Sequence, residues 1–111
     1  MGYVTISNWT TTKWTDEMEE FTRKELVPLV LSAGAKSVQF VRTEELAASV
    51  ITQYEDEATA TAAKAKIAEF RKKLVMNTPL KMVSAHGGVV IARGSCLKAQ
   101  NQKSRDFATD I

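Results

Sequence analysis

His86 is the only histidine of this 111-residue chain, so any imidazole acid–base step would depend on it. It is followed by Gly87 and Gly88, which lack side chains and would leave room for a ligand beside it. We expect His86 to act as a catalytic general base, or to donate a hydrogen bond to a phenolic or quinone oxygen. The alternative is a strand histidine that neighbouring groups satisfy or that faces solvent.

Asn8 is the second candidate for a catalytic role. Strict alternation places it on the same side of a strand as Val4 and Ile6, a side that we assign to the helix-covered face of a sheet. A polar amide among apolar side chains needs hydrogen-bond partners or a ligand. Alternatively, Asn8 lies at the edge of the core and caps the next loop or helix. Together with His86, it would be suited to stabilise an enolate or phenolate for reaction with oxygen.

Two tryptophans, Trp9 and Trp14, stand on either side of the loop that follows the first strand. They predict the aromatic mouth of a substrate pocket. The competing interpretation is packing, with Trp9 in a dimer interface and Trp14 against the first helix. Arg42, at the end of a later strand, would either bind an anion or remain solvated.

The sequence provides little for metal or cofactor binding, and we expect neither. One histidine and one cysteine, Cys96, do not make a clustered set of ligands. Gly87-Gly88 lacks the spacing of a nucleotide-binding loop, and no base stands beside Cys96 to activate it. The net charge of +2 is too small to indicate nucleic-acid binding.

Hydrophobic periodicity predicts the elements that position these residues. Alternating β-prone residues predict strands over 3–9, 37–42, 48–54 and 80–92. Helical spacing predicts a first helix with its N-cap at Asp16, a kink at Pro28 and its end at Gly34, and a second helix over 55–76. Gly87 and Gly88 within the last strand indicate a bulge or a close backbone approach.

The order β-α-β-β-α-β predicts a ferredoxin-like α+β fold, with an antiparallel sheet of four strands and both helices on one face. Alternation then gives the other face a mixed, largely apolar set of side chains: Tyr3, Thr5, Trp9, Gln39, Val41 and Ile51. Such a face is too apolar to remain in water. We therefore expect a homodimer that forms through the sheet faces.

Length and composition set the outer limits. We expect one domain over residues 1–94 and a polar C-terminal tail or arm over 95–111. An apolar content of 44% and a charged content of 25% are typical of a globular protein, and no apolar run predicts a membrane span. The first residues lack a secretory leader and the single cysteine fits a reducing compartment, so we expect a cytoplasmic protein.

Several of these features resemble the dimeric α/β-barrel superfamily, and within it the antibiotic biosynthesis monooxygenase-like group. They are a first strand that ends in Asn8, a first helix with Pro28 late and Gly34 at its close, and Tyr54 before acidic residues and an alanine-rich helix. The resemblance covers roughly residues 3 to 94, the length of a single domain. It implies a homodimeric barrel with a pocket between sheet and helices in each subunit.

The resemblance implies a cofactor-independent monooxygenase that acts on a hydrophobic or aromatic small molecule, and it adds Tyr54 to the two tryptophans as a substrate-binding residue. One alternative is a non-catalytic dimer that binds a ligand or is associated with stress. A second is a haem-degrading monooxygenase, although residues 58–76 contain no histidine to ligate haem. A cavity reached by Asn8 or His86 would favour an enzyme, whereas a tightly filled core would favour the binding protein.

Overall fold

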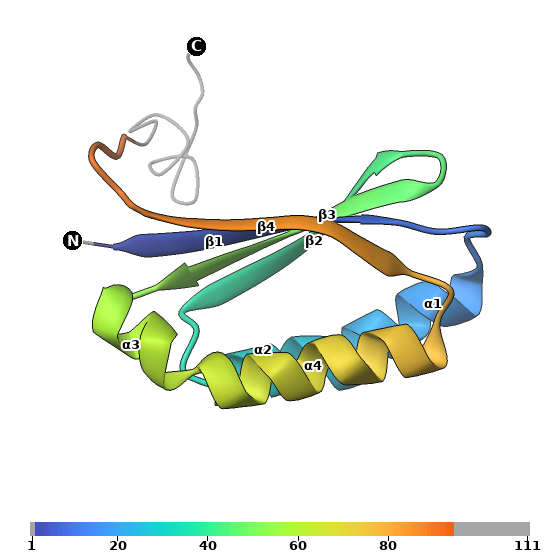
Figure 1. Ribbon diagram of the computed structural model, residues 1–111, viewed down its shortest axis with the longest axis horizontal. Coiled ribbons are helices and arrows are strands. Elements are labelled where there is room, and N and C mark those ends of the chain that lie inside the picture. The colour runs from blue at the N-terminus through green and yellow to red at the C-terminus, as the bar shows by residue number, and fades with distance from the viewer. Residues whose placement is uncertain (1, 95–111) are drawn as a thin grey trace, which may run out of the picture.

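The structure is a computed structural model that describes residues 2–94 (Figure 1). Its strands are β1 (Tyr3–Thr10), β2 (Ser37–Glu44), β3 (Ala47–Tyr54) and β4 (Lys81–Val89). Its helical segments are α1 (Asp16–Phe21), the π-helical η1 (Thr22–Leu26), α2 (Val27–Ser32), α3 (Glu57–Ala62) and α4 (Lys64–Asn77). The tail predicted over 95–111, with Cys96, lies outside the described residues.

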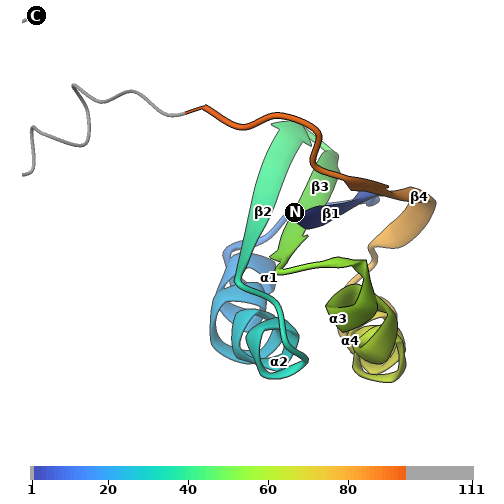
Figure 2. The same ribbon diagram turned by 90° about the vertical axis from the view of Figure 1, so that its left-hand side faces the viewer.

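The four strands form one antiparallel sheet in the order β2-β3-β1-β4. All of the helical segments lie on one side of this sheet, and no element of residues 2–94 covers the other side (Figures 1 and 2). This is the predicted ferredoxin-like arrangement, so the fold prediction is confirmed. Within residues 2–94, no helix is both long enough and apolar enough to cross a membrane.

The first helical part departs from the prediction at its start and in its middle. Thr15, not Asp16, is the N-cap, and its Oγ1 accepts a hydrogen bond of 3.2 Å from the backbone N–H of Met18. The kink expected at Pro28 takes the form of a π-helical stretch over Thr22–Leu26, one residue before α2 begins at Val27. Proline lacks an N–H and its ring crowds the preceding turn, which favours the wider turn.

The second helical part, predicted as one helix over 55–76, is divided at Ala63 into α3 and α4. Asp56 is the N-cap of α3, and its Oδ1 accepts hydrogen bonds from the N–H and the Oγ1 of Thr59 at 2.8 and 2.7 Å. These two hydrogen bonds lower the pKa of the Asp56 carboxyl, with the side-chain bond as the larger cause.

The glycines singled out in the sequence have different structural roles. Gly34 has a φ of 117°, the conformation predicted for the residue that ends a helix. At Gly87 a Cβ would lie 2.5 Å from the hydroxyl of Tyr3, so the predicted close approach is present there. The predicted bulge is elsewhere, because the register of β1 against β4 shifts between Asn8 and Trp9.

The structure reverses the prediction of which side chains of β1 face the helices. Ser7 and Trp9 are buried, whereas Ile6 is 41% exposed and shares its face with Asn8. The indole of Trp9 fills the space under the helices, and its Nε1 donates a hydrogen bond of 2.8 Å to Ser7 Oγ. The predictions that Asn8 and Val4 face the helices, and that Trp9 lies on the other face in a dimer interface, are therefore wrong.

We call the side that packs on the helices the covered face and the opposite side the open face. From the strand register, the covered face carries Tyr3, Thr5, Ser7, Trp9, Val38, Phe40, Arg42, Ala48, Val50, Thr52 and Tyr54. The open face carries Val4, Ile6, Asn8, Gln39, Val41, Ser49, Ile51, Gln53, Ser84, His86 and Gly88. Gln39, Val41 and Ile51 are on the open face as predicted, whereas Tyr3 and Thr5 are not.

The hydrophobic core lies between the covered face and the helices. Its buried members come from the strands, both helical parts and the turn before β4: Trp9, Met18, Leu26, Val30, Val50, Phe70, Leu74 and Leu80. The rings of Phe40 and Phe70 pack edge to face across the layers, with their centroids 5.9 Å apart. The core is filled at this point, and a pocket opens beside it.

Candidate functional site

A partly open pocket of about 410 Å³ lies between the covered face and the helices. Most of its wall is apolar and includes Met18, Val27, Val38, Phe40, Val50 and Leu80. The polar lining residues are Glu19, Thr22, Arg23 and Arg42. An apolar cavity with a few polar groups at one side is the usual form of a small-molecule site.

Trp9 and Trp14 both line this pocket. Trp9 is only 1% exposed, and its indole is held in place by the hydrogen bond to Ser7 Oγ. Trp14 is half-buried at the mouth, and its Nε1 donates a hydrogen bond of 2.5 Å to Glu19 Oε2. The Trp9 indole therefore forms a fixed part of the inner pocket wall, and the Trp14 indole forms part of the wall near solvent.

Arg42 lies over Trp14 at the mouth of the pocket. Its guanidinium carbon is 4.6 Å from the centre of the Trp14 ring, which is the geometry of a cation–π contact. Its Nε and Nη2 donate hydrogen bonds of 3.2 and 2.8 Å to the carbonyl oxygen of Glu45 in the β2–β3 turn. The strand end, the turn and the loop after β1 thus meet around one arginine.

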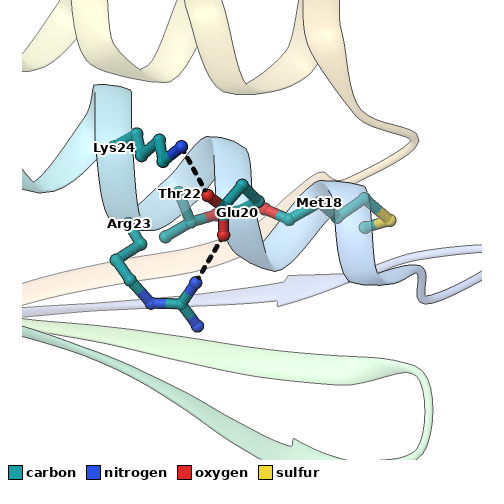
Figure 3. Close-up of polar contacts among 5 residues, drawn as sticks. All are labelled: Met18, Glu20, Thr22, Arg23 and Lys24. Atoms are coloured by element: carbon teal, nitrogen blue, oxygen red, sulfur yellow. Dashed lines mark hydrogen bonds and ion pairs between the residues drawn. The ribbon is translucent and has the colours of Figure 1, made fainter.

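The π-helical stretch supplies the wall opposite the sheet. Thr22 and Arg23 line the pocket, and Thr22 Oγ1 donates a hydrogen bond of 2.8 Å to the carbonyl oxygen of Met18. Figure 3 shows Arg23 extending from the helix toward the sheet, with its Nη1 2.8 Å from Glu20 Oε1. Lys24 Nζ lies 2.8 Å from the other carboxylate oxygen of Glu20. One carboxylate is therefore shared between two cations.

Asn8 and His86 lie on the open face and do not line this pocket. Ser49 Oγ donates a hydrogen bond of 2.6 Å to Asn8 Oδ1, and Asn8 Nδ2 donates one of 3.0 Å to Ser84 Oγ. The amide is thus held in a polar row that crosses β3, β1 and β4. His86 is paired with Ile6, two residues along β1 from Asn8, and it is exposed within residues 2–94.

Tyr54 lies on the covered face but at the other end of β1, where it pairs with Tyr3. It is only 3% exposed, and this burial raises the pKa of its hydroxyl, an effect that Arg71 partly offsets. It does not line the pocket. Asn8 lies toward the opposite end of β1, where it pairs with Ser49.

The structure therefore brings together two of the five predicted site residues, Trp9 and Trp14, at one pocket. Sequence reasoning missed the polar wall of that pocket, Thr22 and Arg23, and left Arg42 open between an anion-binding and a solvated residue. The available signal was helical spacing, since Thr22 and Arg23 each follow another lining residue, Met18 or Glu19, by four positions. Within residues 2–94, no three His, Cys, Asp or Glu side chains are grouped to hold a metal ion.

Comparisons with known proteins show the fold of the chain and not its family. No protein-family model and no curated protein sequence matches it. Among solved structures, it is similar to SnoaB, a cofactor-independent oxygenase from Streptomyces nogalater, at 13% identity and a TM-score of 0.59, covering 85% of this chain and 95% of that one.

Two further structures show the same likeness. One is a dimeric ferredoxin-like protein from an uncultured marine organism, with 14% identity and a TM-score of 0.60 over 85% of this chain and 99% of that one. The other is a candidate antibiotic biosynthesis monooxygenase from Nitrosomonas europaea, with 20% identity and a TM-score of 0.51 over 83% and 94%. The resemblance to the ferredoxin-like, antibiotic biosynthesis monooxygenase-like group is thus confirmed at the level of fold.

Proposed function

We propose that this protein is a homodimeric, cofactor-independent monooxygenase-like enzyme that takes a hydrophobic, aromatic small molecule into the pocket between its sheet and its helices. The observation that carries the proposal is the apolar pocket of about 410 Å³ with two tryptophans in its wall. The fold likeness to a cofactor-independent oxygenase supports it. Trp9 and Trp14 would bind the flat face of the substrate.

In such a reaction the substrate itself supplies the electrons. For a CH2 group activated by a fused aromatic ketone, two C–H bonds break and both electron pairs reduce O2. One oxygen atom forms the new carbonyl, and the other leaves with the two hydrogens as water. A pocket of low polarity favours the neutral, planar reactant, and a nearby hydrogen-bond donor would stabilise its enolate.

The homodimer is proposed through the open face. Between its ends this face carries no lysine, arginine, aspartate or glutamate among the described residues, although 25% of the chain is charged. Ile6 and Val41 are nevertheless 41% and 37% exposed on it. An uncharged, partly apolar face suits burial against an identical face, and the dimeric ferredoxin-like neighbour supports that assembly.

Catalytic roles for Asn8 and His86 are the alternative to chemistry in the pocket, and they require the dimer. On the open face, both side chains would come to lie in the space between the two sheets, near the corresponding residues of the second subunit. A reaction there would be separate from the pocket lined by Trp9 and Trp14. The two locations are therefore distinguished by mutation.

A non-catalytic, ligand-binding dimer is the second candidate, and one observation favours it. The pocket lining contains no histidine, and its one carboxylate, Glu19, accepts the hydrogen bond from Trp14. The one lining carboxylate is therefore already engaged by an indole N–H, and the lining offers no imidazole to act as a general base. Ligand binding without turnover would follow directly from this composition.

The test uses anthrone, a fused aromatic ketone with an acidic CH2 group, in air and without added cofactor. We expect oxygen uptake and an anthraquinone that carries one 18O atom when the gas is 18O2. Ala48→Leu, which narrows the pocket, should lower the rate by about 10-fold or more because the reacting atoms are misplaced. Ala65→Leu adds the same carbons on an exposed residue of α4 that does not line the pocket, and should leave the rate unchanged.

The rates of the variants show where the reaction takes place as well as whether the protein is an enzyme. Loss in His86→Ala and Asn8→Ala, by about 100-fold for the histidine, would support acid–base chemistry at the open face. Loss only in Ala48→Leu would locate the chemistry in the pocket. No uptake from the wild type, with anthrone still bound, would favour the non-catalytic protein.

A further inference from the structure

We propose that the ligand of this pocket carries an anionic group, a carboxylate or a phenolate, which Arg42 binds at the mouth while the apolar part of the ligand lies against Trp9. The inference rests on the proposed function only in taking the pocket as a ligand site. It concerns binding and requires no catalysis. Arg42 would then determine which aromatic molecules the pocket accepts.

Arg42 is fixed in position and still has free donors. The Trp14 ring supports its guanidinium at 4.6 Å, and the two bonds to the Glu45 carbonyl hold its Nε and Nη2. Within residues 2–94, it forms no ion pair and donates no other hydrogen bond. A guanidinium has five N–H donors, so most of them remain for a ligand. Because the group is planar, two of its N–H donors can bind both oxygens of one carboxylate.

The charges around the mouth also favour an anion. Among the residues that line the pocket, Arg23 and Arg42 are cationic and Glu19 is the one carboxylate. Glu20 already bridges Arg23 and Lys24 (Figure 3). Positive charge is therefore in excess in the pocket lining, and Arg42 is the lining cation that forms no ion pair within residues 2–94.

The remaining carboxylate, Glu19, does not cancel Arg42. Its Oε2 accepts the hydrogen bond from Trp14 Nε1, on the edge of the ring whose face Arg42 covers. No oxygen of Glu19 lies within ion-pair distance of Arg42 in the described part of the chain. Glu19 thus orients the indole on which the guanidinium rests, and the outer side of the guanidinium is left for the ligand.

Competition binding tests this proposal. N-phenyl-1-naphthylamine, a neutral dye that fluoresces in apolar sites, reports occupation of the pocket. 2-Naphthoate and 2-naphthamide, which share a ring system and differ in charge, are the competitors. We expect 2-naphthoate to displace the dye at a concentration about 3- to 10-fold lower than 2-naphthamide, the scale of a partly screened ion pair.

Arg42→Gln should remove the advantage of 2-naphthoate and leave displacement by 2-naphthamide unchanged. Arg42→Lys should keep part of the advantage of 2-naphthoate, because lysine retains the positive charge but lacks the planar pair of N–H donors. Arg93→Gln is the matched control, since Arg93 lies in a separate hollow with Gly2 and Glu55. Added salt should weaken 2-naphthoate selectively in the wild type, which tests the charge even where Arg42→Gln fails to fold.

The possible failures are distinct. If the dye does not bind, or if Ala48→Leu does not affect it, the pocket is not a ligand site and the proposed function is contradicted. If the dye binds but both competitors displace it equally, the pocket is a ligand site and the anionic group is wrong. An advantage for 2-naphthoate that persists in Arg42→Gln would also overturn the role of Arg42.

Discussion

The covered and open faces of the sheet are made from alternate residues of the same strands, yet they suit different partners. The covered face carries large rings such as Trp9 and Phe40, and beside them it leaves a pocket of about 410 Å³. The open face carries short or medium side chains and a row of hydrogen bonds through Asn8. Large rings leave gaps that a small molecule fills, whereas a level, uncharged surface fits a second protein surface.

The difference between the faces predicts the largest effect for a side chain under the helices. Trp9→Ala removes an indole that is 1% exposed, and we expect the free energy of unfolding to fall by about 3–5 kcal/mol. Ile6→Ala, on the other face of the same strand, should cost about 1 kcal/mol or less in the monomer because Ile6 is 41% exposed. Urea unfolding of both variants measures this, and equal losses would contradict the assignment of the faces.

The second effect concerns association through the open face. Val41→Asp would bury a charge at each copy of the interface, so we expect the dimer dissociation constant to rise by about 100-fold or more. Val75→Asp makes the same change on α4, where Val75 is 52% exposed, and should leave association unchanged. Sedimentation velocity across a concentration series measures both. A wild-type protein that is monomeric at micromolar concentration would remove the proposed dimer.

The smallest effect depends on pH and on the covered face. Burial raises the pKa of Tyr54 above its ordinary value of 10.0, so the folded protein retains a proton that the unfolded chain releases. The corresponding stability is complete below pH 10.0 and is lost as the pH rises through the folded-state pKa. Tyr54→Phe should flatten this decline, as urea unfolding at several alkaline pH values would show. An unchanged decline in Tyr54→Phe would contradict the burial of this hydroxyl.

The sequence predicted the topology because element order and periodicity carry it. The strands, the glycine with positive φ at Gly34 and the antiparallel sheet follow from local patterns that the structure bears out. The two boundaries that moved, Thr15 as N-cap and the break at Ala63, are one-turn details in which several residues compete.

The choice between the two faces was not predictable from alternation alone. One set of β1 contains Val4 and Ile6, and the other contains Ser7 and Trp9, so mean polarity favours the wrong set. The hydrogen bond from Trp9 to Ser7 makes that polar residue fit for burial, and it depends on side-chain geometry. The positions of Asn8 and His86 followed from the same choice, which explains why the pocket contains neither.

The pocket wall formed by Thr22 and Arg23 was missed because apolar periodicity assigns polar helix residues to the solvent side. The π-helical turn shifts the phase only of the residues that follow it, such as Val27. Pro28 indicated a disturbance but not its form. The anion-binding interpretation of Arg42 likewise needed the observed contact with Trp14.

The central claim is that the pocket of the covered face, and not the open face, binds the small molecule. The most direct measurement is a 1H–15N NMR titration with 2-naphthol, a soluble aromatic probe without a carboxylate. We expect saturable shifts of the indole N–H signals of Trp9 and Trp14, and little change at the backbone amides of Ile6, Ser49 and His86. Saturable shifts at those open-face amides with both indole signals unmoved would contradict the account.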